Sequence, residues 1–111
     1  MIKLIRFYFV HRKRVYPKPY YAVLESTLNQ QYKPGTVAKY GAFTRDGTRW
    51  QTIVVTDVYD VDYRPRFEAI KAKQIYRKHF NQHELRSWKA FSKDHGYENL
   101  VINERGDNDE K

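Results

Sequence analysis

Apolar side chains occupy both alternating faces of residues 2–10, IKLIRFYFV. One face carries Ile5, Phe7 and Phe9, and the other carries Ile2, Leu4, Tyr8 and Val10. A strand that is apolar on both faces lies inside a sheet rather than at its edge, so this run predicts a central strand. Lys3 and Arg6 fall on opposite faces, which indicates that one face is partly open to solvent.

A β-hairpin is predicted for residues 36–58, with Asp46 and Gly47 as its turn. This dipeptide favours a type I′ turn, in which both central residues have a positive φ. With these two residues as the loop, Phe43 faces Trp50, and an aromatic cross-strand pair contributes about 0.2–1 kcal/mol. The second arm is apolar on both faces, which predicts another central strand.

Residues 20–31 fit two structures. Apolar side chains recur at every fourth residue from Tyr20 to Leu28, and Pro19 suits the start of a helix. We therefore expect a helix here, with a strand at 19–25 as the alternative.

Two helices are predicted in the C-terminal half, at 66–80 and 82–94. The first segment has helically spaced apolar residues opposite a row of Lys and Arg. The second begins with the capping pair Asn81 and Glu84, and Gly96 ends it.

The order of these elements, with a short last strand at 98–103, matches the ferredoxin-like βαββαβ plan. The expected fold class is α+β: a small antiparallel sheet with its hairpin at 36–58 and two C-terminal helices packed on one face. An antiparallel meander of three or four strands under the helical pair is the alternative. We expect one basic domain over residues 1–103 and a flexible acidic tail over 104–111.

Composition narrows the class of protein. A chain of 111 residues with 16% aromatic residues can form one compact core. The chain has no cysteine, which excludes disulfides and thiolate metal sites and favours an intracellular protein. Lys3 and Arg6 interrupt the apolar N-terminus, and no stretch approaches the ~20 apolar residues of a membrane span. We expect a soluble protein of the cytoplasm, or of the nucleus in a eukaryote, that is not secreted.

The net charge of +8 is unevenly distributed. Residues 1–95 hold 19 Lys and Arg against 8 Asp and Glu, whereas residues 96–111 hold 2 against 5. Concentrated positive charge is typical of proteins that bind a polyanion, because each phosphate contact releases condensed counterions. The alternative is that the excess Lys and Arg only keep the chain soluble.

Two groups of side chains are candidate nucleic-acid contacts. The first lies in the loop at 11–19 and comprises Arg12, Lys13, Arg14, Tyr16 and Lys18. Cations beside aromatic rings suit single-stranded nucleic acid, and the sheet residues Tyr8, Phe9 and Trp50 are further stacking candidates. The second group is expected on the outward faces of the helices and comprises Arg64, Arg66, Lys71, Lys73, Arg77, Lys78 and Lys89.

Carboxylates at the end of the hairpin's second arm, Asp57, Asp60 and Asp62, resemble a magnesium site, and His79 and His83 have helical metal-ligand spacing. Neither group has an evident further ligand, so no metal and no cofactor are predicted.

The leading prediction is a small, non-enzymatic nucleic-acid-binding protein that acts through phosphate contacts and aromatic stacking. No catalytic motif is evident. The alternative is an accessory or inhibitory protein, of the type found in phages and mobile elements, that binds a protein of a nucleic-acid-processing machine. A third hypothesis is a metal-independent ribonuclease in which His11, beside Arg12 and Tyr16, does the acid–base chemistry.

Overall fold

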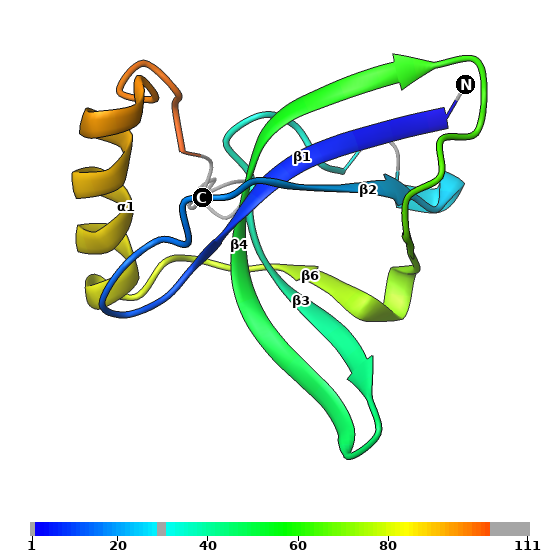
Figure 1. The fold of residues 1–111 in the computed structure, drawn as a ribbon, viewed down its shortest axis with the longest axis horizontal. Coiled ribbons are helices and arrows are strands. Elements are labelled where there is room, and N and C mark those ends of the chain that lie inside the picture. The colour runs from blue at the N-terminus through cyan, green and yellow to red at the C-terminus, as the bar shows by residue number, and fades with distance from the viewer. Residues whose placement is uncertain (1, 29–30, 103–111) are drawn as a thin grey trace, which may run out of the picture.

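The computed structural model describes residues 2–28 and 31–102. Within these residues, six strands form one sheet in the order β5-β2-β1-β4-β3-β6. The sheet curls into a half-barrel, and a single α-helix lies against its outer face (Figure 1).

The strands are β1 (Ile2–Val10), β2 (Tyr20–Leu24), β3 (Val37–Thr44), β4 (Gly47–Val61), β5 (Ala69–Ile70) and β6 (Ile75–Arg77). The helix is α1 (Gln82–His95), and two single 3₁₀ turns are η1 (Ser26–Leu28) and η2 (Ala72–Gln74). Neighbouring strands are antiparallel, except that β5 pairs with β2 in parallel.

The predicted fold class is wrong. The structure is mostly sheet, it has one C-terminal helix instead of two, and its strand order excludes the ferredoxin-like plan. The segment 66–80 forms β5, η2 and β6 rather than a helix. Its apolar residues serve two short strands at opposite edges of the sheet, where Ile70 and Ile75 both enter the same core. Strand pairing with β2 and β3 thus outweighs the helical spacing.

The helix predicted at 20–31 is also wrong, and the alternative strand is confirmed as β2. Ala22 and Leu24 enter the core inside the half-barrel, as expected for alternate residues of a strand. Residues 98–102 contain no strand. Residue 103 and the predicted acidic tail at 104–111 lie outside the described residues.

The two predicted central strands are confirmed. β1 pairs with both β2 and β4, and β4 pairs with both β1 and β3. The hairpin is confirmed too, but its turn lies one residue earlier than predicted. Thr44 pairs with Gly47, so Arg45 and Asp46 form the loop, and only Gly47 in this turn has a positive φ, of 121°. Trp50 therefore faces Gly41 rather than Phe43.

The inner core fills the concave side of the half-barrel. It includes Ile5, Phe7, Ala22, Leu24, Leu28, Tyr32, Ala38, Tyr40, Ile53, Val55, Ile70 and Ile75. Every strand contributes to it, and for this reason even the two-residue β5 and the three-residue β6 hold their places at the sheet edges.

The outer core lies between the convex face of the sheet and α1. It contains Tyr8, Val10, Val15, Val37, Val54, Phe80, Trp88 and Phe91. The helix begins with the predicted capping box of Asn81 and Glu84 and ends at Gly96, whose φ of 81° is left-handed. The predicted helix at 82–94 is therefore confirmed, one residue longer at its C-terminal end.

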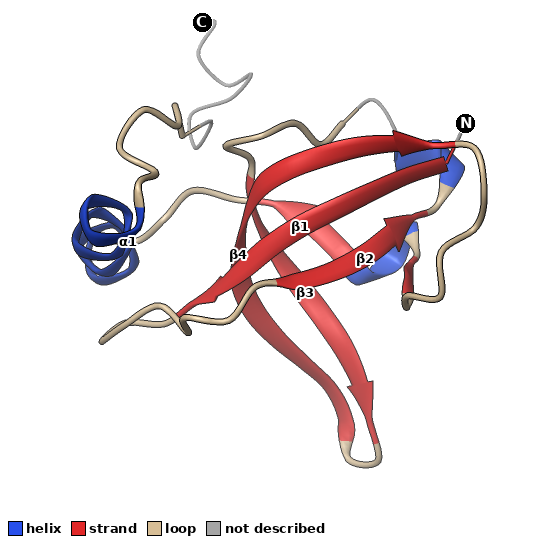
Figure 2. Cartoon of the chain, turned by 45° about the horizontal axis from the view of Figure 1, so that its top comes forward, coloured by secondary structure: helices blue, strands red, loops and turns tan. Residues whose placement is uncertain are grey.

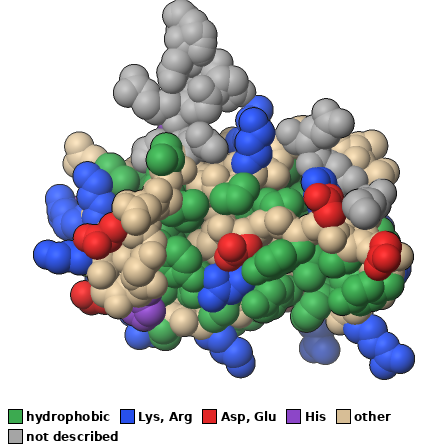
Figure 3. All heavy atoms as spheres, turned by 90° about the horizontal axis from the view of Figure 1, so that it is seen from above, with side chains coloured by type: hydrophobic (Ala, Val, Ile, Leu, Met, Phe, Trp, Pro, Cys, Tyr) green, Lys and Arg blue, Asp and Glu red, His purple; other side chains and the backbone are tan. Residues whose placement is uncertain are grey.

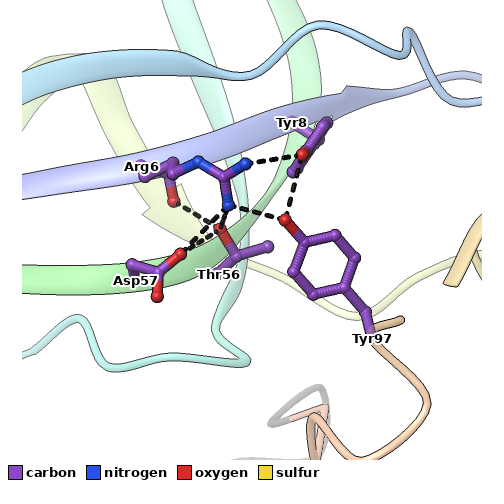
Figure 4. A network of polar contacts seen from close by, with 5 residues as sticks. All are labelled: Arg6, Tyr8, Thr56, Asp57 and Tyr97. Carbon is purple, nitrogen blue, oxygen red and sulfur yellow. Dashed lines mark hydrogen bonds and ion pairs between the residues drawn. The ribbon is translucent and has the colours of Figure 1, made fainter. Parts of the chain in front are cut away.

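A polar network fixes the segment after the helix to the sheet (Figure 4). Arg6 donates hydrogen bonds to Asp57 (3.2 Å), to the Tyr97 hydroxyl (2.6 Å) and to the Tyr8 hydroxyl (2.9 Å). The two tyrosine hydroxyls lie 3.0 Å apart. Burial disfavours the charged guanidinium, but the bonds to Tyr97 and Asp57 outweigh it and raise the pKa of Arg6. Burial, together with the bond to Tyr97, raises the pKa of Tyr8 to about 12.

The raised pKa of Tyr8 makes stability depend on alkaline pH. Because the folded pKa of about 12 exceeds the ordinary value of 10.0, the neutral phenol stabilises the fold below pH 10. That contribution is lost as the pH rises from 10 to about 12. We expect the free energy of unfolding, measured by urea titration, to fall less steeply over this range in Tyr8→Phe than in the wild type. Equal slopes would contradict the role given to this hydroxyl.

Candidate functional site

An open hollow lies where β1 ends and β4 continues into the hairpin. Its volume is about 380 Å³, and it is lined by Val10, His11, Arg12, Arg49, Trp50, Gln51, Thr52 and Glu84. Pairing between β1 and β4 ends at Val10 and Thr52, so residues 47–51 pair with β3 alone. The free side of β4 therefore opens onto the loop that follows β1.

That loop, residues 11–14, is a short turn held in place by hydrogen bonds. The His11 N–H donates to the Arg14 carbonyl at 2.8 Å. The Ser87 hydroxyl of α1 donates to the Arg12 carbonyl at 2.9 Å. The cations Arg12, Lys13 and Arg14 are all exposed on this turn. Backbone anchoring thus fixes the turn beside the hollow while its charged groups stay in solvent.

The β3–β4 hairpin projects beyond the rest of the molecule as a two-stranded ribbon (Figures 1 and 2). Its exposed side chains include Phe43 and Trp50. Arg45 and Arg49 are also exposed, and the only carboxylate of the loop is that of Asp46. The ribbon therefore adds positive charge and aromatic surface to the same end of the molecule as the loop at 11–14.

Trp50 and Tyr76 form an exposed aromatic pair, which we call the aromatic platform. Their ring centroids lie 5.6 Å apart, and their planes are inclined by 43°. The Lys39 ammonium lies 5.2 Å from the Trp50 centroid and 5.6 Å from that of Tyr76. These distances are typical of cation–π contacts. Since Trp50 also lines the hollow, the platform adjoins it.

Glu84 lies at the floor of the same region and is engaged by its neighbours. Its carboxylate accepts hydrogen bonds from the Thr52 hydroxyl, the Asn81 N–H (3.0 Å) and the Lys78 ammonium (2.9 Å). Burial would raise the pKa of Glu84, but these three donors outweigh it and lower that pKa. The Lys78–Glu84 pair is thus a structural tie between β6 and α1, and it neutralises the one carboxylate of the hollow.

Glu84→Gln is expected to lower the free energy of unfolding near pH 7 by about 1.5–3 kcal/mol, the contribution of a hydrogen bond to a charged group. Because the folded pKa is below the ordinary value of 4.5, the carboxylate stabilises the fold above that pH and stops doing so as the pH falls. The difference from the wild type in urea titrations should therefore shrink in acid. Glu98→Gln, at an exposed position after the helix, is the control. A difference that persists in acid would contradict this role.

The structure brings together part of the first predicted group. Arg12 lines the hollow, and Lys13 and Arg14 are exposed on the same turn. Tyr16 lies next to them, with its ring centroid 4.4 Å from that of His11 and 5.2 Å from the Arg14 guanidinium. Lys18 is exposed farther along the same loop.

The second predicted group is not gathered on helices. Arg64 and Lys71 line a separate depression of about 360 Å³ that also includes Ile2, at the opposite end of β1 from the hollow. Arg66 is exposed between β4 and β5, Lys73 lies in η2, Arg77 ends β6, and Lys78 follows it in the pair with Glu84. Lys89 alone of this group lies on a helix, on the exposed side of α1.

Three residues of this region were missed by the sequence reasoning. Arg49 lines the hollow, Tyr76 forms the platform with Trp50, and Lys39 lies against both rings. The available signal was Gly41, since a hairpin turn placed one residue earlier sets this glycine opposite Trp50. Of the other stacking candidates, Tyr8 is buried and Phe9 packs against the inner core, so Trp50 is the exposed one.

Strand alternation separates Asp57 from Asp60, two of the carboxylates whose sequence pattern resembles a magnesium site. Asp57 pairs with Arg6, and Asp60 forms a 2.6 Å ion pair with Lys3 on the other face. Over residues 2–28 and 31–102, no three His, Cys, Asp or Glu side chains lie together in a way that could hold a metal ion. The His11 Nε2 atom is buried without a hydrogen-bond partner among the described residues.

Comparisons with protein-family models, with curated proteins and with solved structures found no match for this chain. In the part of the chain that the structure describes, no helix has the length and apolar content needed to span a membrane.

Proposed function

We propose that this protein binds nucleic acid through phosphate contacts at the end formed by the hollow, the loop at 11–14 and the β3–β4 ribbon. The observation that carries the proposal is that Arg12 and Arg49, from two distant parts of the chain, line one hollow. Guanidinium groups suit phosphate because their planar forks donate paired hydrogen bonds to its oxygens.

The charge balance around the hollow supports this proposal. Arg12 and Arg49 line the hollow, and the loop and the ribbon carry further exposed cations: Lys13, Arg14, Lys39 and Arg45. Opposing them are Asp46 at the ribbon tip and Glu84, whose charge is balanced by Lys78. Phosphates entering this region therefore meet an excess of positive charge, which also speeds the encounter with a polyanion.

The test is fluorescence anisotropy with labelled single-stranded RNA, single-stranded DNA and duplex DNA, titrated at about 50 and 200 mM salt. We expect sub-micromolar binding to at least one probe, a steep loss of affinity at the higher salt, and an intact probe. Binding that is absent, or equally weak for all three probes, would contradict the proposal. Cleavage of the RNA probe would contradict a non-enzymatic binding protein, and His11 would then be the candidate for acid–base catalysis.

A second candidate function rests on an exposed apolar patch at the other end of the sheet. Tyr21 and Phe67 stack with centroids 5.4 Å apart, and Tyr59 pairs with Leu4 on the same outer face. All three rings are more than a third exposed, at 38%, 46% and 41% for Tyr21, Phe67 and Tyr59. Figure 3 shows hydrophobic side chains gathered on this side, with an acidic and a basic side chain between them. Exposed aromatic clusters anchor many protein interfaces, so this patch favours docking to a nucleic-acid-processing protein.

Photo-crosslinking separates this second function from the first. Benzoylphenylalanine in place of Tyr59 should give one discrete adduct with a nucleic-acid-processing protein in cells, whereas the same group in place of Glu98 should not. No adduct, or the same adducts at both positions, would contradict docking through this patch.

A further inference from the structure

The aromatic platform exists because position 41 is a glycine. β3 lies between β4 and β6, so the rings of Trp50 and Tyr76 must meet across it. A Cβ atom at Gly41 would lie 2.7 Å from Thr48 Cγ2 and 2.9–3.0 Å from two carbon atoms of the Trp50 ring. Real Cβ contacts are not this short, so any other residue here displaces the indole. Because Gly41 has no side chain, the indole of Trp50 can lie over β3.

The two rings are too exposed to be explained as core. Trp50 is 43% exposed and Tyr76 is 47% exposed, whereas Trp88 in the outer core is 2% exposed. Burial of large rings is favourable, so surface left open on both members of a packed pair marks a contact surface. The Lys39 ammonium lies against both rings.

Trp50 belongs to both the platform and the lining of the hollow, so the platform adjoins the hollow that Arg12 and Arg49 line. Proteins bind single-stranded nucleic acid with this combination, in which cations track the phosphates and successive bases stack on rings. We infer that the platform stacks unpaired bases, so that the nucleic acid bound at this end is single-stranded; this inference rests on the function proposed above. Lys39 then meets the phosphate of the stacked nucleotide.

A duplex does not fit the platform in the same way. Base faces in a duplex are covered by their neighbours, and only the edges of the bases are presented in the grooves. The projecting ribbon could enter a major groove, but contact there would use the ribbon tip and its arginines rather than the faces of Trp50 and Tyr76. A preference for single strands over duplex therefore tests whether the rings of Trp50 and Tyr76 take part in binding. Unpaired bases of RNA and DNA offer the same stacking face, and separate probes distinguish the two.

The experiment compares Trp50→Ala and Tyr76→Ala with Tyr63→Ala, a variant of an exposed ring after β4 that lies outside the hollow, the ribbon and the platform. Labelled single-stranded RNA, single-stranded DNA and duplex DNA of about 12 nucleotides per strand cover one binding site of this size. We expect each platform variant to bind the preferred single strand at least about 10-fold more weakly, within the range measured for loss of one stacked base. Trp50→Phe should retain most of the affinity, duplex binding should change by less than about twofold, and Tyr63→Ala should behave as the wild type.

The outcomes separate this inference from the function on which it rests. If the wild type binds none of the probes, the proposed function fails and the inference falls with it. If the wild type binds but the platform variants do so equally well, phosphate binding stands and base stacking is overturned. Equal losses on single-stranded and duplex probes would overturn it as well.

Discussion

Reversing the charges of Arg12 and Arg49 together, in R12E/R49E, is expected to weaken binding of the preferred nucleic acid about 100-fold at low salt. Each charge-assisted hydrogen bond contributes about 1.5–3 kcal/mol, and 1.4 kcal/mol corresponds to a factor of ten. The slope of log affinity against log salt should also fall by about two, because two phosphate contacts are lost. Fluorescence anisotropy over a salt series measures both quantities.

The matched control is K33E/K93E, which changes the net charge by the same amount at exposed positions outside the hollow. This control should weaken binding by less than about fivefold, because only the long-range field changes. Equal losses in the two double variants would show that net charge alone governs binding and would contradict a site at the hollow.

Trp88→Ala is expected to lower the free energy of unfolding by about 3–5 kcal/mol, the usual cost of removing a buried large aromatic side chain. Trp88 is 2% exposed, and its ring lies 5.6 Å from Phe91 and 5.8 Å from Tyr97. A domain of this size has a total stability of about 5–15 kcal/mol, so the loss is a large share of it.

Urea denaturation, followed by circular dichroism so that loss of the tryptophan signal does not matter, measures this change. Trp50→Ala serves as the comparison, since that ring is 43% exposed and should cost less than about 1.5 kcal/mol. A small effect of Trp88→Ala would mean that α1 is not held to the sheet by the outer core.

Elements set by local chemistry could be predicted from the sequence. The two-faced apolar run of β1 and the capping pair Asn81 and Glu84 each specify a structure without help from distant residues. The segment 66–80 does not, because its helical spacing also fits two short strands joined by one turn. Only the partners β2 and β3, which are distant in sequence, decide between these structures.

The candidate site was predictable to a similar degree. The density of Arg12, Lys13 and Arg14 marks a basic loop in any fold. Its partner Arg49 and the platform depend on the hairpin register, and moving the turn by one residue changes the residue opposite Trp50 from Phe43 to Gly41. Tyr76 lies within the segment 66–80 that was expected to be a helix, and it is instead an exposed ring on an edge strand. The strand order β4-β3-β6 brings Trp50, Lys39 and Tyr76 together. Their proximity could not be predicted before that order was known.

The two tryptophans allow the most direct measurement of where nucleic acid binds. Trp50 lies at the hollow, and Trp88 lies on the buried face of α1, in the outer core. In a ¹H–¹⁵N NMR titration with the preferred oligonucleotide, the indole resonance of Trp50 should shift, together with backbone resonances of residues 11–16 and 39–51. The Trp88 indole and the amides of Tyr21 and Tyr59 should stay in place. Binding that leaves Trp50 unmoved and shifts the amides of Tyr21 and Tyr59 instead would contradict a nucleic-acid site at the hollow.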